Sequence, residues 1–442
     1  MPLPPRRRRS FRRSLRLRAL RIWWPRVRRR ALFLFGGIAV GGLAILMAAL
    51  ADRAQALFAA ITQRSAYAPL AVTPLGFALA AWLAARHFPN AGGSGIPQVI
   101  AAHGIADRAA RDPLVSLGVA FGKIVLLILG LACGASSGRE GPTVQVGASV
   151  MYALGRLAPQ RQPGLLIAGS AAGIAAAFNA PLAGIIFGIE EMSRSFEERT
   201  SGLILGTVIA AGLTSLGLVG DYTYFGRTSD VMPFGAEWLA VPVMGVAGGL
   251  LGGVFSRILI QAGRGFPGAA GRAVKARPIL FAALCGLGVA LCGAGAENSV
   301  FGTGYDQAKA ILHGTSPLPW SFGPLKFAAT VLSSASGIPG GIFAPSLAVG
   351  AGLAENLRGL LPMAPIGVLT VLGMVSYLSG VVQAPITSFV IVDEMTENHA
   401  LVIPLMICAI LANAVSKSVY PHGVYHTLSR NYLPAAEPAA HR

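Results

Sequence analysis

Long apolar segments that glycine and proline cut into short pieces are the feature of this chain that most restricts its fold. Its 442 residues include 56 glycines and 29 prolines, and many of the resulting apolar pieces are too short to cross about 30 Å of hydrocarbon as one helix. Irregular backbone at membrane depth is tolerated only where protein buries it or where it lines a polar cavity. The interruptions therefore predict broken helices around a transport pathway.

The composition indicates a protein embedded in a membrane. Hydrophobic residues make up 54% of the chain and charged residues only 12%, whereas an ordinary soluble domain has about 25% charged residues. We therefore expect an all-α, multi-pass integral membrane protein. The more polar segments are interpreted as loops or helix ends: 87–113, 194–203, 219–237, 262–278, 293–323 and 393–400.

The positive charge is concentrated at the N-terminus. Residues 1–30 contain 13 arginines and no acidic residue, so they carry most of the formal net charge of +18. Such a segment could contact nucleic acid, but beside an apolar run it more simply keeps the N-terminus cytoplasmic and touches anionic lipid. We expect an Arg-rich cytoplasmic tail in contact with the lipid bilayer and no nucleic-acid partner.

Two pairs of similar segments indicate an internal repeat. Residues 138–148 and 341–351 share their first glycine, a proline, a Thr/Ser position and a closing Val-Gly-Ala at an offset of 203. Residues 179–184 and 383–388 form a second pair at an offset of 204, and each leads into an apolar run that ends in Glu-Met. Repeats in transporters are often inverted, with matching broken helices that meet near the midplane. The sequence therefore predicts two inverted-topology repeats.

The repeat also suggests how the chain is divided. The offset of 203 pairs Glu140 with Phe343, so these residues are predicted to approach one site from opposite sides. The expected organisation is an N-terminal tail (1–30), a first membrane repeat (31–225), a second membrane repeat (236–430) and a short C-terminal tail (431–442).

Three glycine-bounded segments have the form of a helix start: Gly93-Ser94-Gly95-Ile96-Pro97, Gly138-Arg139-Glu140-Gly141-Pro142 and Gly341-Ile342-Phe343-Ala344-Pro345. Glycine permits a non-helical approach of the backbone, and proline near a helix start wastes no hydrogen bond. The first N–H groups of a helix lack internal partners and its dipole is positive there, so three such ends directed at one place would bind an anion. Ser94 could add a hydroxyl donor, and Ile342 and Phe343 could add backbone N–H groups. The alternative is that each segment is a small-residue packing motif between helices.

Glu140 is a candidate for the gate of this site. A carboxylate beside a helix end that attracts anions would mimic the anion and compete with it, and protonation would release the carboxylate. An ionisable group at membrane depth is a functional candidate by default. The alternative is a structural ion pair of Glu140 with Arg139 or Lys123.

Two further acidic residues lie at the end of an apolar run. Glu190 and Glu191 follow the apolar residues 180–189, so at least one of them is a candidate internal acid on a proton path. The alternative is that both begin a solvated loop. Glu394 holds the matching place in the second repeat, where it is interpreted as part of a polar helix end.

The three glycine-bounded segments, in this order, resemble the CLC family of chloride channels and proton-coupled chloride transporters over about residues 31–430. The resemblance implies a homodimer with one pore per subunit, formed by two inverted repeats of many tilted helices. Ser94 resembles the family's central serine, whose hydroxyl binds chloride, and Ile342 and Phe343 match its backbone donors. Glu140 matches the gating glutamate.

The resemblance extends to two residues outside these segments. Tyr425, in Gly-Val-Tyr-His-Thr-Leu, resembles the tyrosine whose hydroxyl completes the central site, although its neighbours depart from the usual pattern and Tyr420 lies five positions earlier. Glu191 matches the internal proton-transfer glutamate, which favours exchange over a passive channel. Gln98 stands where some transporters have a glutamate, so details of the proton route can differ here.

The function expected from the resemblance is chloride/proton antiport in a bacterial inner membrane. Ser94 favours chloride over nitrate, the intact motifs argue against the fluoride branch, and no long region follows residue 430 to form regulatory domains. The first alternative is a passive voltage- or pH-gated chloride channel of the same fold. The second is an intramembrane enzyme with Glu140 and Glu191 as an acid/base pair, which the absence of a nucleophile or metal set disfavours. Beyond the transported chloride and proton, we expect no cofactor or metal.

Overall fold

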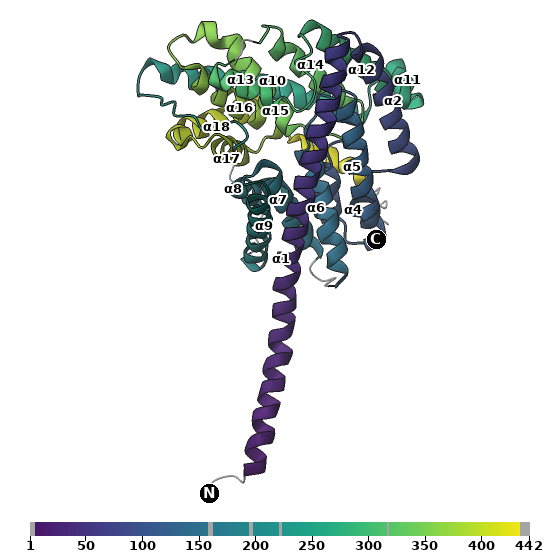
Figure 1. The fold of residues 1–442 in the computed structure, drawn as a ribbon, viewed down its shortest axis with the longest axis vertical. Helices are drawn as coiled ribbons and strands as arrows, with labels where there is room; N and C mark the ends of the chain where they lie inside the picture. Colours follow the sequence, from purple (N-terminus) through teal and green to yellow (C-terminus); the bar gives the residue numbers. More distant parts are fainter. Residues whose placement is uncertain (1–4, 158–161, 194–197, 221–222, 316–317, 434–442) are drawn as a thin grey trace, which may run out of the picture.

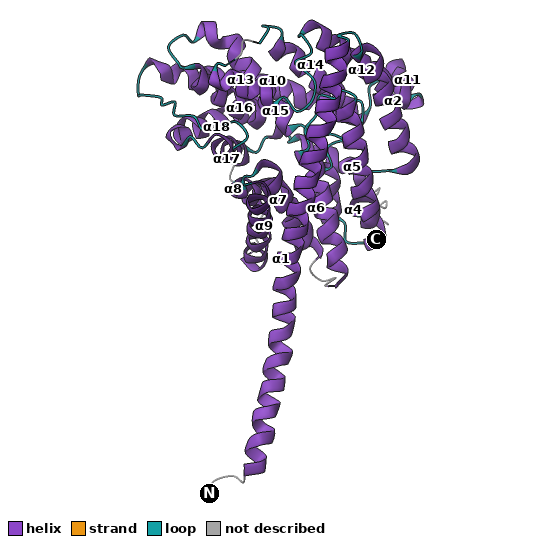
Figure 2. Cartoon of the chain, in the orientation of Figure 1, coloured by secondary structure: helices purple, strands orange, loops and turns teal. Residues whose placement is uncertain are grey.

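The structure is a computed structural model that describes residues 5–157, 162–193, 198–220, 223–315 and 318–433. Figure 1 shows the arrangement of its helices, and Figure 2 shows that this part of the chain contains helices and loops but no strand. The expected all-α fold is confirmed.

Among the described residues, the first half of the chain forms nine α-helices: α1 (Pro5–Arg64), α2 (Pro69–His87), α3 (Ile96–Gly104), α4 (Arg108–Val115), α5 (Leu117–Ala132), α6 (Glu140–Leu154), α7 (Gln162–Phe178), α8 (Pro181–Phe187) and α9 (Glu198–Val219). A π-helical turn, η3 (Gly188–Ser193), lies between α8 and α9. Short 3-10 turns are η1 (Gly155–Leu157), η4 (Ala236–Leu239), η5 (Arg358–Leu360), η6 (His399–Leu401) and η7 (Arg430–Tyr432).

The described part of the second half forms ten α-helices: α10 (Ala240–Arg264), α11 (Gly268–Ala276), α12 (Pro278–Gly295), α13 (Tyr305–His313), α14 (Phe322–Ala335), α15 (Phe343–Leu357), α16 (Ile366–Val382), α17 (Pro385–Thr396), α18 (Val402–Val419) and α19 (Val424–Ser429).

The helices of the two halves correspond to one another. Helices α6 and α15 each have 15 residues, and α7 and α16 each have 17. Their starting residues are separated by 203 and 204 positions, the offsets of the sequence repeat. The two-repeat prediction is thereby confirmed. The boundaries proposed for the repeats stay a prediction, and residues 434–442 of the expected C-terminal tail lie outside the described residues.

The contact between Gly138 and Gly341 shows that the repeats are inverted. These repeat-related glycines form an isolated antiparallel bridge, in which the N–H of each donates to the carbonyl oxygen of the other at 2.7 Å. An antiparallel pair between equivalent residues places a local twofold relationship at this point. It also brings the starts of α6 and α15 together.

The helices that flank this point are short, as the broken segments predict. A helix of 15 residues rises about 22 Å, less than the thickness of the membrane core, and Glu140 and Phe343 at the starts of α6 and α15 are buried.

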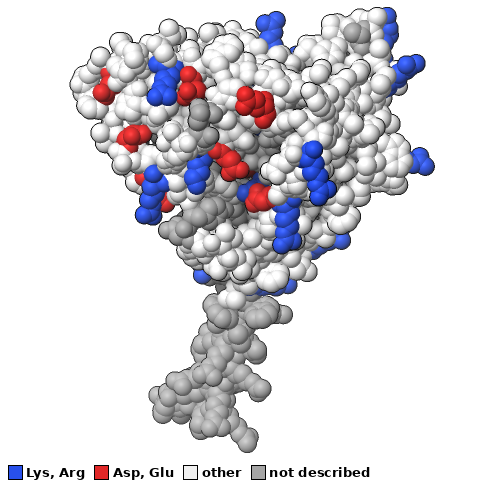
Figure 3. All heavy atoms as spheres, turned by 45° about the horizontal axis from the view of Figure 1, so that its top comes forward, with Lys and Arg blue, Asp and Glu red and all other residues white. Residues whose placement is uncertain are grey.

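Figure 3 shows that charged side chains are sparse on the face it draws. Among the described residues, seven helical segments are long and apolar enough to span a membrane: Arg30–Arg64, Pro69–His87, Arg108–Ala132, Gly202–Val219, Ala236–Arg264, Pro278–Gly295 and His399–Val419.

Helices also occur where the sequence suggested loops or helix ends. The polar segments contain α3, α4, α11 and α13, and residues 198–203 belong to α9, whereas residues 194–197 lie outside the described part. In α4 the side chain of Asp107 accepts hydrogen bonds from the first N–H groups. In α13 the apolar residues Ala308, Ile311 and Leu312 are buried at helical spacing. A capping side chain and one narrow apolar face suffice for helices of eight or nine residues, so mean polarity was a poor guide here.

The Arg-rich segment and the first apolar run form one helix. Helix α1 projects from the body of the molecule at its N-terminal end (Figure 1). Along the body it packs parallel to α9, since Gly37 lies against Thr207 and Gly41 against Ala211. The start of α9, and with it the turn η3, therefore lies on the same side of the bundle as the N-terminal end of α1.

Candidate anion and proton site

Three helices begin at the predicted segments and converge. Helix α3 starts at Ile96 after Gly95, α6 at Glu140 after Arg139, and α15 at Phe343 after Ile342, and none of these starts has a hydrogen bond from the side chain of its cap residue. Gly95 has a φ of +98°, a conformation that glycine adopts without strain. The helix-start predictions are confirmed, and the N–H groups of the first turns are left for another partner.

The packing alternative also holds for part of these segments. A Cβ built on Gly141 would collide with Ser94 Oγ, and one built on Gly341 would lie 2.9 Å from the backbone nitrogen of Gly141. The glycines therefore permit close packing, and this packing is what brings α3, α6 and α15 to one place. A packing role and a binding role are compatible here.

Two buried hydroxyl groups face this place. Ser94 Oγ and Tyr425 Oη are buried and have no hydrogen-bond partner among the described residues, yet they are close enough to interact with each other. An unsatisfied buried hydroxyl costs about 1–3 kcal/mol, so a ligand that accepts from both would remove this cost. A chloride ion has the chemistry to do so.

Tyr425 lies beside Phe343 and Ser94, whereas Tyr420 has other neighbours. The ring of Tyr425 stacks on Phe343 with centroids 6.0 Å apart, and its hydroxyl interacts electrostatically with both Glu140 and Glu191. Tyr420 instead lies beside His422, with a ring separation of 6.2 Å. Tyr425 is therefore the residue whose hydroxyl we include in the candidate site.

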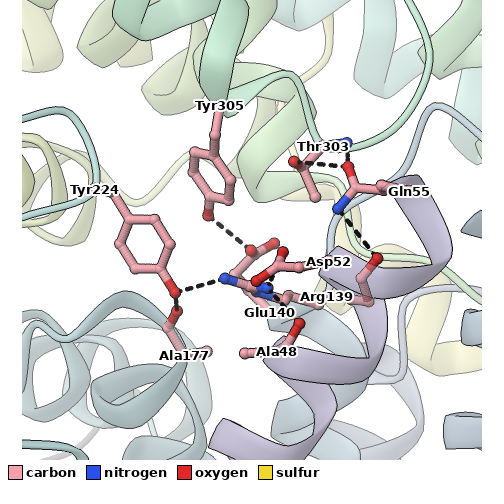
Figure 4. Close-up of polar contacts among 10 residues, drawn as sticks. Ala48, Asp52, Gln55, Arg139, Glu140, Ala177, Tyr224, Thr303 and Tyr305 are labelled. Atoms are coloured by element: carbon pink, nitrogen blue, oxygen red, sulfur yellow. Dashed lines mark hydrogen bonds and ion pairs between the residues drawn. The ribbon is translucent and has the colours of Figure 1, made fainter. Parts of the chain in front are cut away.

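The Glu140 side chain is folded onto the start of α15. Its Oε2 lies beside Gly138 and close to Ala344 and Pro345, and the backbone N–H of Ala344 interacts with the carboxylate. Oε1 accepts a hydrogen bond of 2.7 Å from the hydroxyl of Tyr305 (Figure 4). The carboxylate thus occupies the position at a helix start that an anion would take.

Neither basic neighbour forms an ion pair with this carboxylate, which contradicts the structural alternative for Glu140. Arg139 donates from Nη1 to Asp52 Oδ1 at 2.7 Å and to the Ala48 carbonyl at 2.9 Å. Lys123 donates to the carbonyl oxygens of Gly92 and Gly93 at 3.0 and 2.8 Å. Lys123 thereby holds the loop that carries Ser94, and Arg139 acts on Glu140 electrostatically without forming an ion pair.

Three residues near Glu140 were missed in the sequence. Arg139 Nη2 donates to Tyr224 Oη at 2.7 Å, and Tyr224 donates to the Ala177 carbonyl at 2.9 Å (Figure 4). The rings of Tyr224 and Tyr305 stack with centroids 4.8 Å apart. Asp52, Tyr224 and Tyr305 lie in segments without a recognisable motif, so no local signal could have found them.

A cavity of about 470 Å³ lies next to this cluster. We call it the Glu140 cavity, because Tyr305, which lines it, donates a hydrogen bond to the Glu140 carboxylate. Its polar lining comes from residues of α1, the 298–304 segment and α13, together with Arg139 and Tyr224: Asp52, Gln55, Thr62, Arg139, Tyr224, Asn298, Thr303, Tyr305, Asp306 and Gln307.

The two neighbouring glutamates of η3 have different surroundings. Glu190 accepts hydrogen bonds from the N–H groups of Ile386 and Thr387 at 3.2 and 2.7 Å, at the start of α17. Glu191 is buried, and its Oε1 lies 3.7 Å from Nε2 of His426. The alternative that both begin a solvated loop is therefore wrong for these two side chains.

Glu394 mirrors Glu190 across the repeat. Its two carboxylate oxygens accept from the N–H groups of Leu182 and Ala183 at 3.0 and 2.7 Å, at the start of α8. Each repeat thus supplies a glutamate to the first turn of a helix in the other. The interpretation of Glu394 as part of a helix end is right, and the partner helix was not foreseen.

A second cavity, of about 580 Å³, lies on the side of η3, where the N-terminal end of α1 also lies. We call it the Glu191 cavity. Its titratable lining residues come from η3, α18, α19 and the turns beside them: Glu190, Glu191, Lys417, His422, His426 and Arg430. The hydroxyl of Tyr425 interacts with both Glu140 and Glu191, so it belongs to the surroundings of both acids.

Fold and site together define a class of protein. Two inverted repeats, helix starts that meet inside the bundle, and buried acids toward two cavities are the architecture of a membrane protein that moves small ions. The sequence pattern of the family described as "Voltage gated chloride channel" matches residues 76–417. The chain therefore belongs to the CLC family.

Individual relatives agree with this assignment. The H(+)/Cl(-) exchange transporter ClcA of Yersinia pestis bv. Antiqua (strain Angola) is 32% identical over 405 residues, which cover 84% of this chain and 80% of that protein. ClcA of Salmonella typhi is also 32% identical, over 83% of this chain and 81% of its own length.

Solved structures share the fold. A slow cyanobacterial Cl−/H+ antiporter matches with a TM-score of 0.78 and 24% identity, over 91% of this chain and 97% of its own. A CLC-type fluoride/proton antiporter matches with a TM-score of 0.75 and 22% identity, over 92% and 98% of the two chains.

Proposed function

We propose that this protein exchanges chloride for protons across a membrane, with Glu140 as the gate and Glu191 as the internal proton acceptor. The observation that carries the proposal is the position of the Glu140 carboxylate. It lies at the start of α15 beside Gly138 and Ala344, and it interacts electrostatically with the buried hydroxyl of Tyr425. The names of the ClcA relatives support chloride and proton as the exchanged ions.

The gate follows from competition for the helix starts. An ionised Glu140 and a chloride ion are both attracted to the N–H groups at the start of α15, and they repel each other. Protonation removes the charge of the carboxylate, so the side chain leaves and chloride takes its place. Bound chloride is then held by Ser94, Tyr425 and the backbone N–H groups of Ile342 and Phe343.

The proposed proton path uses a second acid because Glu191 lines a cavity whose lining does not include Glu140. Glu191 is buried next to that cavity, and the Tyr425 hydroxyl interacts with both carboxylates. A proton taken up by Glu191 can thus reach Glu140 when the anion site is in use. In each transport cycle, chloride and the Glu140 carboxylate replace each other at the helix starts, and a proton moves.

Two substitutions test these roles separately in proteoliposomes with a chloride gradient. Glu191→Gln removes the internal acid, and we expect chloride flux to continue while proton flux is lost. Glu140→Gln makes the gate permanently neutral, and we expect chloride flux that no longer depends on pH and carries no protons. If proton flux driven by chloride is unchanged in Glu191→Gln, Glu191 is not the acceptor. A passive channel would show large chloride current without uphill proton movement in the unsubstituted protein.

The orientation follows from the Arg-rich segment. Arginines beside a membrane helix favour the cytoplasmic side, and the Glu191 cavity lies on the side of the N-terminal end of α1. We therefore place this cavity in the cytoplasm and the Glu140 cavity outside, in a bacterial inner membrane. Accessibility of cysteines introduced at Thr62 and at His422 to a membrane-impermeant thiol reagent tests this orientation: only the former should react from outside.

The homodimer with one pore per subunit also remains a proposal, as does contact of the Arg-rich segment with anionic lipid. Cross-linking in native membranes, followed by mass measurement, tests the dimer. A single band at the mass of one chain across all cross-linker lengths would contradict it.

A further inference from the structure

His426 lies beside Glu191 in the lining of the Glu191 cavity, and its side chain is the more exposed of the two. Its imidazole lines the cavity, and Nε2 is 2.9 Å from the Glu191 carbonyl oxygen and 3.7 Å from Glu191 Oε1. The Glu191 side chain is only 5% exposed, whereas that of His426 is 24% exposed. The imidazole is therefore in contact with the buried acid and accessible from the cavity.

The charges around His426 come from several elements. Glu190 and Glu191 of η3, Lys417 of α18, His422 of the preceding turn and Arg430 of η7 line the same cavity. Helices α3 and α10 also pack on α19. The ionisable side chains of these two helices are His103, Arg257 and Arg264, and none of them lines the cavity.

Only some of these groups suit proton transfer. Both Glu190 oxygens already accept from the start of α17, and the cationic Lys417 and Arg430 repel an incoming proton. Imidazole is the side chain that ordinarily gains and loses a proton near neutral pH. Of the two histidines in the lining, His426 lies against Glu191, while the ring of His422 lies beside Tyr420.

We propose that His426 passes protons between the Glu191 cavity and the carboxylate of Glu191. The inference rests on the proposed antiport and adds a residue to its proton route. When a proton moves from the cavity to Glu191, a small rotation of the His426 ring brings Nε2–H of the imidazolium from 3.7 Å to hydrogen-bond distance of Oε1. The N–H bond breaks as the O–H bond forms, leaving neutral imidazole and neutral carboxylic acid. A hydronium ion in the cavity then protonates Nε2 again and becomes water, and the reverse sequence releases a proton from Glu191.

A purely structural role makes a different prediction. In that case the Nε2–H of His426 only donates to the Glu191 carbonyl and holds the η3 turn in place. A glutamine at position 426 can supply an N–H donor without titrating. Substitution by glutamine therefore separates the two roles.

The test measures proton and chloride flux of the full chain in proteoliposomes while the pH on the Glu191 side is varied. For His426→Gln we expect proton flux to fall by roughly tenfold or more, because a positioned acid/base group is lost, and its pH dependence near neutrality to flatten. His422→Gln is the matched control, since it removes a histidine from the same cavity, and its flux should stay within about twofold of the unsubstituted protein. Unchanged chloride binding by calorimetry shows that each variant is folded.

Chemical rescue gives an independent measurement. A cavity of about 580 Å³ has room for free imidazole, so imidazole added to His426→Ala should restore part of the proton flux and should restore none in Glu191→Gln. The relay is overturned by an unchanged flux and pH profile in His426→Gln, by an equal loss in His422→Gln, or by no rescue. If the alanine variant no longer binds chloride, the pH profile of the glutamine variant decides. An unsubstituted protein without chloride-driven proton flux would instead refute the antiport itself.

Discussion

The hydroxyl of Tyr305 donates a 2.7 Å hydrogen bond to Oε1 of Glu140, joining α13 of the second repeat to α6 of the first. The rest of the Tyr305 ring is held by its stack on Tyr224, which in turn accepts from Arg139. The proposed gate is thus held in place by a tyrosine whose own position is fixed. How easily the carboxylate leaves the anion site should depend on this one hydroxyl.

Tyr305→Phe should loosen the gate. A hydrogen bond to a charged group contributes about 1.5–3 kcal/mol, and its loss leaves the carboxylate a weaker competitor for the start of α15. We expect chloride to bind about tenfold more tightly, as measured by calorimetry at neutral pH.

The control for this substitution is Tyr224→Phe. It removes a hydroxyl that contacts Arg139 and the Ala177 carbonyl and that makes no hydrogen bond to Glu140, so chloride affinity should change much less. Equal affinities for the unsubstituted protein and Tyr305→Phe would show that the hydroxyl does not hold the gate.

Removal of either buried hydroxyl of the anion site should weaken chloride binding. Ser94→Ala and Tyr425→Phe each delete a donor that has no other partner among the described residues, and such a hydrogen bond contributes about 0.5–1.5 kcal/mol. Calorimetry should show chloride affinity reduced by about threefold to tenfold, with altered selectivity among anions in flux assays. Tyr420→Phe is the matched control and should leave affinity unchanged. Unaltered affinity in both Ser94→Ala and Tyr425→Phe would refute the site.

The glutamate that each repeat contributes to a helix start in the other repeat should stabilise the fold. Glu394→Gln removes the charge and one of two acceptors at the start of α8, and Glu190→Gln does the same at the start of α17. Each should cost about 1–2 kcal/mol, seen as a lower apparent Tm in detergent.

Glu397→Gln is the comparison for this pair. Its partner Arg227 is 74% exposed, and exposed ion pairs contribute about 0–1 kcal/mol. Its Tm should therefore stay close to that of the unsubstituted protein. If the three variants melt at the same temperature, the contacts of Glu190 and Glu394 have no special stabilising role.

Features encoded locally could be predicted from the sequence. The glycines and proline around Glu140 and Phe343 mark helix starts because backbone freedom and a missing N–H are properties of the residues themselves. The inverted repeat could be detected because its segments still share residues at fixed offsets. Both expectations hold in the structure, down to the bridge between Gly138 and Gly341.

Features that depend on contacts between distant residues could not be predicted from the sequence. Tyr305 is 165 positions from Glu140 and His426 is 235 positions from Glu191, and neither residue stands in a pattern that marks its partner. Position along the chain also does not reveal that His422 and His426 line the same cavity. Likewise, Lys123 is an ordinary lysine in sequence, and only the fold shows that it holds the loop of Ser94.

The most direct test of chloride/proton exchange is to record both fluxes simultaneously from the unsubstituted protein in proteoliposomes, with a chloride gradient and no initial pH difference. We predict that chloride moving down its gradient drives protons uphill in the opposite direction, at a fixed ratio, until a pH difference forms. Chloride flux that dissipates its gradient without forming any pH difference would contradict it.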